Sequence, residues 1–225
     1  MAQFERKFRL DEAELEFFKN LQTLIGSPAP PLKKKFPETL RAVCGADAAY
    51  SDTNNRVVAA AVFFADGQLE ETSVYAGTFT FPYFPGLFYL HEGPFVIAAV
   101  RNLKKIPDLV CFDAHGTAHP RAKGLATICG MVLELRSIGI AKSHLVGKSV
   151  AYKEGVAVTE YSGRKVGLET MKPRRYWSPG HAVSMHELER VVVSPDREIC
   201  LEAMIEAHRL ATEALSFTKK TTRHL

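Results

Sequence analysis

The spacing of apolar residues changes from helical to extended within the first 80 positions. Residues 10–25 carry apolar side chains three or four positions apart, which predicts an amphipathic helix with Asp11 as its N-cap. Residues 41–50, 56–64 and 70–79 are rich in Val, Ala and aromatic residues and are separated by turn-forming residues. We therefore expect an antiparallel meander of three strands after the helix.

The rest of the chain alternates predicted helices and strands. Strands are predicted at 108–113 and 137–141, with shorter extended runs at 155–161 and 165–171. Helix starts are predicted at four places: Gly93-Pro94 (a helix to about 106), Pro120 (to about 135), Ser184 with Glu187 as a capping box, and Ser194-Pro195. This order predicts an α/β fold, with a meander and then parallel strands in one mixed sheet flanked by helices.

One domain of residues 1–225 accounts for this pattern, with an amino-terminal helix and basic linker at 1–35, core motifs at 41–181 and carboxyl-terminal helices at 182–225. The 46% hydrophobic and 24% charged residues are typical of globular proteins, and the net charge of +4 permits an anionic partner. The four cysteines lie far apart, which favours buried thiols over a disulfide framework or zinc site. Without an apolar run that fits a signal peptide or spanning helix, we expect a cytoplasmic protein with no membrane partner. We also expect a monomer.

Residues 78–94 contain an aromatic tripeptide between two prolines, Pro82-Tyr83-Phe84-Pro85, followed by Gly86. Each proline removes a backbone donor and fixes its own φ, so this stretch predicts a stiff, exposed turn. Tyr83 at the tip is then either a wedge or stacking platform for nucleic-acid bases, or a cap on the hydrophobic core.

Three carboxylates occur in an order that has chemical meaning. Asp47 lies among small apolar residues of the first strand and needs a partner there, for which a metal ion is one candidate. Glu92 stands at a helix entrance and Asp113 at the end of a buried strand. In ribonuclease H-like folds, carboxylates at these three places converge on divalent metal, because Mg²⁺ prefers oxygen ligands.

Taken together, the motifs resemble those of the endonuclease V family, whose members act on deaminated bases. The resemblance spans about residues 41–181. It rests on Gly45-Ala46-Asp47, Phe81-Pro82-Tyr83-Phe84-Pro85-Gly86 with Glu92-Gly93-Pro94, Phe112-Asp113 with Gly116 and His119-Pro120-Arg121, Gly124-Leu125-Ala126, Ile138-Gly139-Ile140-Ala141-Lys142-Ser143, and Ser178-Pro179-Gly180-His181.

The resemblance implies a ribonuclease H-like, metal-dependent endonuclease for inosine-containing DNA or RNA. Such an enzyme cuts the second phosphodiester bond 3′ to the deaminated base and leaves 3′-hydroxyl and 5′-phosphate ends. It also implies that Asp47, Glu92 and Asp113 bind Mg²⁺, for which Mn²⁺ can substitute. Lys142 would assist at the phosphate, and Tyr83 would fill the space of an extruded base.

A pocket for hypoxanthine is implied as well, with Pro82, Tyr83, Gly86, Phe88, Ala114, Gly116, His119, Gly124 and Leu125 as substrate-binding residues. Position 114 is alanine where the family commonly has glycine, and the extra methyl group could either hold the base away from the pocket or narrow the pocket against guanine. Residues 200–204 also depart from the family's Pro-Glu-Pro-Thr-Arg stretch. His208 falls in register with a histidine that lies near the metals in some members and would then be a catalytic residue, but a hydrogen-bonded core histidine is equally open.

Two other functions remain compatible with the sequence. A ribonuclease H-like nuclease with another substrate, such as structured DNA or RNA, gains weight from Ala114. A non-catalytic binder of flipped bases would keep Tyr83 but would be expected to lack one of the carboxylates. The sequence does not distinguish DNA from RNA, because contacts to a 2′-hydroxyl cannot be recognised in it.

Overall fold

A computed structural model describes residues 12–25, 35–51 and 55–221. Within these ranges the helices are α1 (Glu12–Leu24), α2 (Phe88–Arg101), α3 (Leu125–Leu133), α4 (Met185–Val193) and α5 (Asp196–Thr221). The strands are β1 (Ala42–Ser51), β2 (Arg56–Ala65), β3 (Gln68–Thr78), β4 (Leu109–Phe112), β5 (Ser137–Ala141), β6 (Lys148–Lys153), β7 (Val156–Tyr161), β8 (Arg164–Met171) and β9 (Arg174–Pro179). None of the helices in the described ranges is both long and apolar enough to cross a bilayer.

The strands form one mixed sheet in the order β3-β2-β1-β4-β5-β9-β8-β7-β6. The predicted meander β1-β2-β3 is antiparallel, and β4 and β5 add to β1 in parallel, as expected. Beyond β5 the sheet continues with antiparallel strands, so the sheet is mostly antiparallel. Two of these antiparallel strands, β6 and β9, were not predicted from the sequence.

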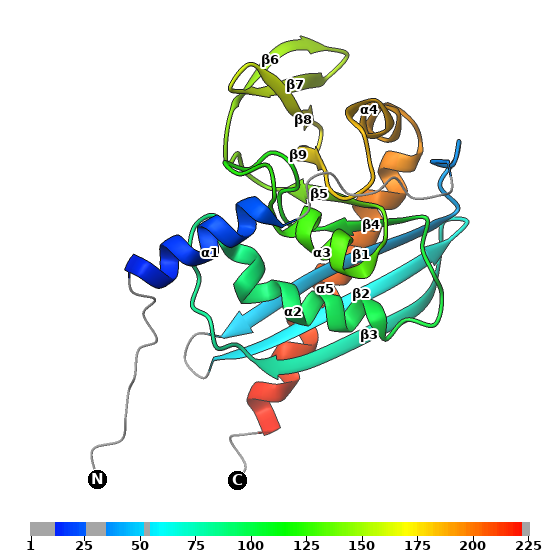
Figure 1. Ribbon diagram of the computed structural model, residues 1–225. Coiled ribbons are helices and arrows are strands. Elements are labelled where there is room, and N and C mark those ends of the chain that lie inside the picture. The colour runs from blue at the N-terminus through cyan, green and yellow to red at the C-terminus, as the bar shows by residue number, and fades with distance from the viewer. Residues whose placement is uncertain (1–11, 26–34, 52–54, 222–225) are drawn as a thin grey trace.

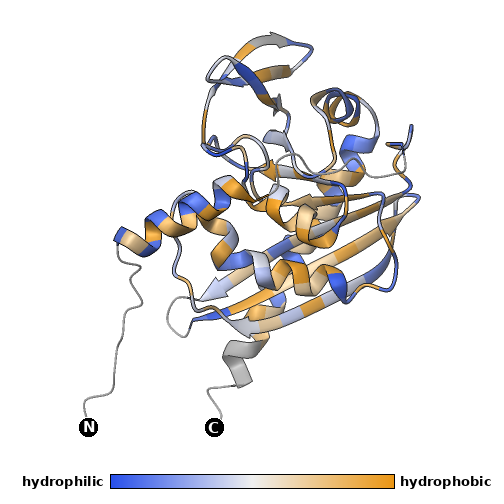
Figure 2. Ribbon diagram, viewed as in Figure 1, coloured by the Kyte–Doolittle hydropathy of each residue, from blue (hydrophilic) through white to orange (hydrophobic). Residues whose placement is uncertain are grey.

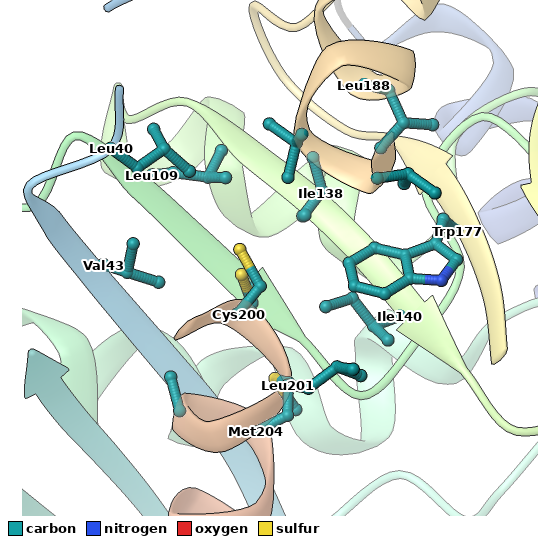
Figure 3. Packing of buried hydrophobic residues seen from close by; sticks show 14 of the residues in the cluster. Leu40, Val43, Leu109, Ile138, Ile140, Trp177, Leu188, Cys200, Leu201 and Met204 are labelled. Atoms are coloured by element: carbon teal, nitrogen blue, oxygen red, sulfur yellow. The ribbon is translucent and has the colours of Figure 1, made fainter. Parts of the chain in front are cut away.

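Helices cover both faces of the sheet (Figure 1). α2 and α3 pack on one face, with α1 beside them, and α5 runs along the other face behind β1 and β2. Hydrophobic residues occupy nearly all of β2, which is buried by these two layers (Figure 2). Figure 3 shows the core on the α5 side, where Trp177 of β9 and Ile138 of β5 face Cys200 and Met204 of α5. All four cysteines are buried and free, as predicted.

Helix α5 lies unusually close to the backbone of β1 at Gly45. A Cβ atom built on Gly45 would stand 2.2 Å from the carbonyl oxygen of Ala203, far inside normal contact distance. Only glycine therefore allows α5 to sit this close to the strand. Asp47 lies two residues along β1 on the same face, so this close contact also fixes α5 beside Asp47.

Two predicted helices begin at other residues in the structure. α2 begins at Phe88 rather than at Pro94, so Pro94 lies inside the helix. Burial of Tyr89, His91 and Glu92 stabilises the turn that precedes the proline, and packing outweighs the missing hydrogen bond. α2 ends at Arg101 rather than near residue 106, and Ile106 is 80% exposed.

Pro120 does not open a helix. Residues 117–122 form consecutive turns, with Ala122 in the left-handed region at φ 55°, and such a residue interrupts helical geometry. α3 therefore begins only after Gly124, its N-cap residue. The capping box of Ser184 with Glu187 at the start of α4 and the start of α5 after Pro195 agree with the predictions.

α1 forms as predicted, although its Asp11 cap lies outside the described residues. The expected apolar stripe is not its buried face, since Phe17 is 61% and Leu24 78% exposed. Instead the polar Gln22 is fully buried. The helix is oriented by the polar contacts of Gln22 and by partial burial of Leu15 and Phe18 against the core.

Candidate active site

Two carboxylates meet at one edge of the sheet because of strand pairing. β1 and β4 run in parallel with Ala46 opposite Phe112, so the following residues, Asp47 and Asp113, lie side by side where β4 ends. The carboxyl ends of parallel strands are where such sheets commonly place functional groups. Asp47 is buried, and Asp113 is half-buried.

Each of these carboxylates has a cationic or potentially cationic partner. Nδ1 of His208, on α5, lies 2.7 Å from Oδ2 of Asp47. The ammonium group of Lys142, just after β5, donates to Oδ2 of Asp113 at 2.5 Å. One ligand atom from each of Asp47, Asp113 and His208 lies within 4.8 Å of the others, so these three residues could hold a metal ion.

Glu92 approaches the same point from α2 but lies outside that group of three. Burial, followed by the negative charges of Asp47 and Asp113, raises the pKa of Glu92 well above its usual range, and Lys142 opposes this effect. Burial and Asp113 likewise raise the pKa of Asp47, against the stabilising contacts of His208 and the amide of Ala48. The three carboxyl groups therefore repel one another, and a divalent cation would relieve this repulsion.

The donor atoms fit a hard divalent cation. Carboxylate oxygens are the protein ligands preferred by Mg²⁺ and Mn²⁺. His208 already contacts Asp47, and an imidazole in this place holds a ligating carboxylate in a fixed orientation. The arrangement is thus compatible with metal ligation by Asp47 and Asp113, with Glu92 nearby.

His208 is not a core histidine, the alternative left open by the sequence. Its side chain is 57% exposed and its ring contacts Asp47 across the interface between α5 and β1. Leu201 and Met204 on the same helix are buried, whereas Ile205 is 63% exposed. The spacing of apolar residues around His208 therefore predicts which residues of α5 are buried, but it does not predict where the imidazole lies.

A cavity of about 260 Å³ adjoins the carboxylates. Asp113 and Lys142 form part of its wall, so it opens directly beside the candidate metal ligands. Most of the residues predicted to bind substrate line it, namely Tyr83, Gly86, Phe88, Ala114, His119, Gly124 and Leu125. Its size suits a small ligand such as a single base rather than a folded strand.

Two of the predicted substrate-binding residues do not line this cavity. Pro82 lies next to Tyr83 in the turn of residues 81–86 and is half-buried. Gly116 is buried, and its amide donates to Oγ of Ser178 at 2.8 Å. This hydrogen bond occupies the amide that the family resemblance would offer to a base.

Tyr83 stands at the rim of the cavity. Its side chain is 55% exposed, and its ring meets Phe88 edge-on with centroids 5.6 Å apart. The buried ring of His91 anchors the turn from below, with Nδ1 2.6 Å from the carbonyl oxygen of Phe81. The turn therefore holds Tyr83 outward as a stiff aromatic group, which favours the wedge over the core cap.

Gly86 ends the same turn. Its φ is 79°, in the left-handed region that favours glycine. Its carbonyl oxygen accepts from Nη2 of Arg121 at 2.6 Å and lies 3.1 Å from Nε2 of His119. The backbone amide of Arg121 donates to Nδ1 of His119, so the imidazole carries its proton on Nε2 and donates it to Gly86. Only a neutral imidazole leaves Nδ1 free to accept, so the contact with the Arg121 amide requires His119 to be neutral.

Acid is expected to weaken this arrangement. Burial and the charge of Arg121 lower the pKa of His119 from 6.5 to about 4. Between these values the unfolded chain binds a proton that the folded chain excludes, so the contribution of His119 to stability falls as the pH drops. Melting temperatures of the wild type and of His119→Gln, which does not titrate, should therefore converge between pH 7 and 4.5. Parallel curves would contradict a neutral His119.

Several lining residues were not assigned from the sequence. Gln22, Tyr89, His115, Ser143, His144 and Leu145 also line the cavity. His115 and His144 are adjacent to motifs that resemble those of the family, so the sequence could have marked them as neighbours of the site. Gln22 comes from α1, and no local pattern in the sequence marks it.

A second cavity of about 150 Å³ lies on the α5 side of Asp113. Asp113 and Lys142 line both cavities, and His208 and Arg175 line the second. Asp113 is thus flanked by a hollow on each side. An extended chain could pass from one hollow to the other across Asp113.

Comparisons with known proteins identify the family of the chain. The sequence model of endonuclease V matches residues 29–209. Endonuclease V of Saccharolobus islandicus is 35% identical over 173 residues, which cover 77% of this chain and 84% of that protein. The protein of the same name from Sulfolobus acidocaldarius is 34% identical over 180 residues, covering 80% of this chain and 87% of the relative.

Solved structures show the same architecture. Endonuclease V of Streptomyces avermitilis aligns with a TM-score of 0.74 at 28% identity, covering 95% of this chain and 96% of that chain. Endonuclease V of Ciona intestinalis, solved with a DNA that contains an inosine followed by a ribo-adenosine, has the same fold, with a TM-score of 0.74 at 17% identity, covering 93% of this chain and 100% of that one. On the extent of the family match and the identity to its members, the chain belongs to the endonuclease V family.

Proposed function

We propose that this chain is a divalent-metal-dependent endonuclease that cleaves inosine-containing DNA or RNA at the second phosphodiester bond 3′ to the deaminated base. The observation that carries the proposal is the position of Asp47, Asp113 and His208 beside a base-sized cavity with Tyr83 at its rim. Asp113 and Lys142 form part of the cavity wall, so a base held there would lie beside the carboxylates. The family and the inosine-containing DNA bound to the Ciona protein support this substrate class.

The residues divide the chemistry among them. Asp47 and Asp113 would hold Mg²⁺, which activates water and stabilises the leaving 3′ oxygen when bound. His208 keeps the Asp47 carboxylate in one orientation through its hydrogen bond. Lys142 is 58% exposed, so its ammonium group can move from Asp113 to a phosphate oxygen and offset developing negative charge.

A cleavage assay tests the proposal directly. Matched single-stranded RNA, single-stranded DNA and duplex DNA, each with one inosine or with guanine or adenine in its place, are incubated with Mg²⁺ or with EDTA. We expect Mg²⁺-dependent cleavage of the inosine-containing strands, with 3′-hydroxyl and 5′-phosphate ends at the second bond. Cleavage without base preference would indicate a nuclease for another substrate, and binding without cleavage would indicate a binder of flipped bases.

Replacing Tyr83 is expected to affect duplexes most. An extruded base leaves an unstacked gap that costs a few kcal/mol, and an inserted aromatic ring recovers about 1–3 kcal/mol of it. Tyr83→Ala should therefore weaken binding of inosine-containing duplex DNA by about tenfold, with a smaller loss for single strands. Tyr75→Ala, which removes a half-exposed tyrosine from β3, is the control. Equal losses on duplexes and single strands would contradict the wedge.

A further inference from the structure

Gln22 is a buried polar residue that reaches the base cavity from outside the region matched by the family. The family match begins at residue 29, whereas Gln22 lies on α1, which spans Glu12–Leu24. Its side chain is completely buried and forms part of the cavity wall. The helix that carries it exposes apolar residues to solvent while burying this amide, so the position of Gln22 requires a reason other than hydrophobic packing.

Both ends of the Gln22 amide are used. Its Oε1 accepts from Nε of Arg121 at 2.5 Å, and its Nε2 donates to the carbonyl oxygen of Lys123 at 2.5 Å. Guanidinium groups only donate and carbonyl groups only accept, so these partners determine the orientation of the amide. Among side chains of this length, glutamine supplies a donor and an acceptor together.

The contacts continue from Arg121 to the wall of the cavity. Arg121 donates through Nη2 to the carbonyl oxygen of Gly86, while its Nε donates to Gln22. The guanidinium is planar and rigid, so fixing Nε also fixes the direction of Nη2. Gln22 thereby holds the donor that holds the Gly86 peptide.

Further contacts keep α1 in place at this point. The ammonium group of Lys123 donates to the backbone carbonyl of Thr23 at 2.6 Å. Phe18 meets Phe81, at the start of the Tyr83 turn, edge-on with ring centroids 5.5 Å apart. α1 is therefore attached to both loops that enclose the cavity, at Phe81 to Gly86 and at Arg121 to Gly124.

We propose that Gln22 is a positioning residue of the base pocket, which sets selectivity for the extruded base by fixing Arg121 and, through it, the Gly86 wall. This inference rests on the proposed function, because selectivity is defined by cleavage at inosine. Gln22 acts through Arg121 and does not contact the carboxylates. Its removal should therefore loosen the fit of the base while the hydrolytic groups stay in place.

The test compares Gln22→Met with Asn20→Met. Methionine keeps the length of the side chain and loses both hydrogen bonds, while Asn20 is an exposed position on the same helix. Gln22→Met is expected to lower the ratio of kcat/KM for inosine over guanosine strands by about tenfold, mainly through KM. Its kcat at saturating substrate and its Mg²⁺ dependence should match those of the Asn20→Met control.

Two further variants separate positioning from folding. In Gln22→Glu the carboxylate still accepts from Arg121, so most of the selectivity should return although the donor to Lys123 is lost. In Arg121→Met, adding Gln22→Met should cause no further loss of selectivity, because both changes remove the same contact. A merely structural Gln22 would lower the melting temperature and leave the inosine ratio unchanged.

The outcomes distinguish the two proposals. A wild type that prefers inosine, with a Gln22→Met variant of unchanged selectivity, would overturn the positioning role alone. Additive losses in the double variant would overturn the route through Arg121. A wild type that shows no preference for inosine would overturn both the positioning role and the proposed function.

Discussion

Asp47→Asn is expected to lower the Mg²⁺-dependent cleavage rate at least about a hundredfold while leaving the fold intact. The amide keeps the size of the side chain and can still bond to His208, but it removes an anionic ligand from a group of three carboxyl groups. A metal site that loses one charged ligand binds its cation more weakly and activates water less. The measurement is the rate on an inosine-containing single strand over a series of Mg²⁺ concentrations.

Stability should move in the other direction. Burial and the neighbouring charge of Asp113 raise the pKa of Asp47, because both disfavour its ionised form in the folded chain without a cation. A neutral amide relieves that repulsion, so the melting temperature of Asp47→Asn in EDTA should equal or exceed that of the wild type. Asp66→Asn, in the turn between β2 and β3, is the control for removal of a carboxylate away from the site. Wild-type cleavage by Asp47→Asn would refute the metal assignment.

The order of the strands in the first half could be predicted because local signals and tertiary structure agree there. Apolar runs between turn residues specified β1 and β2, and the Asp66-Gly67 turn followed by Val, Tyr and Ala residues specified the more exposed β3. Strands β6 and β9 escaped prediction because their residues, Lys148–Lys153 and Arg174–Pro179, include many polar and charged side chains. Their extended conformation depends on hydrogen bonds to β7, β8 and β5, which no local pattern reports.

The residues of the candidate site also fall into those that could be predicted from the sequence and those that could not. Asp47, Asp113 and Tyr83 could be predicted because each belongs to a short motif whose residues are adjacent in the sequence. Gln22 could not, since its partners Lys123 and Arg121 are 101 and 99 positions away. His208 was ambiguous because its neighbours on α5 follow the spacing of a core helix, and only the close contact of α5 with β1 brings its ring to Asp47.

Gly45→Ala is expected to lower both stability and the cleavage rate, because Gly45 of β1 lies in close contact with α5. The added methyl group would stand 2.2 Å from the carbonyl oxygen and 2.4 Å from the carbonyl carbon of Ala203, so either α5 or β1 must move. Overpacking of this kind costs about 1–3 kcal/mol of unfolding free energy, and more where backbone must shift. Because His208 follows Ala203 on the same helix, the shift should also disturb its bond to Asp47 and lower the cleavage rate about ten- to a hundredfold.

Unfolding in urea and cleavage well below the melting temperature measure the two effects separately. Gly93→Ala is the control for stability, because its methyl group would lie 3.5 Å from Sγ of Cys129, an ordinary contact, within helix α2. This control should be neutral or slightly stabilising, since alanine favours the helix. Wild-type stability of Gly45→Ala would show that α5 does not rest on the strand at this point.

A double variant can test whether the added methyl group meets backbone or side-chain atoms of α5. The atoms nearest the added methyl group belong to the backbone of Ala203, and the Ala203 side chain is 3.0 Å away. Shortening that side chain in the double variant Gly45→Ala, Ala203→Gly therefore leaves the main clash in place. It also adds a helix-destabilising glycine, which costs about 1 kcal/mol. The double variant should be less stable than Gly45→Ala, whereas recovery of stability would mean that side chains, rather than the backbone of α5, meet β1 at Gly45.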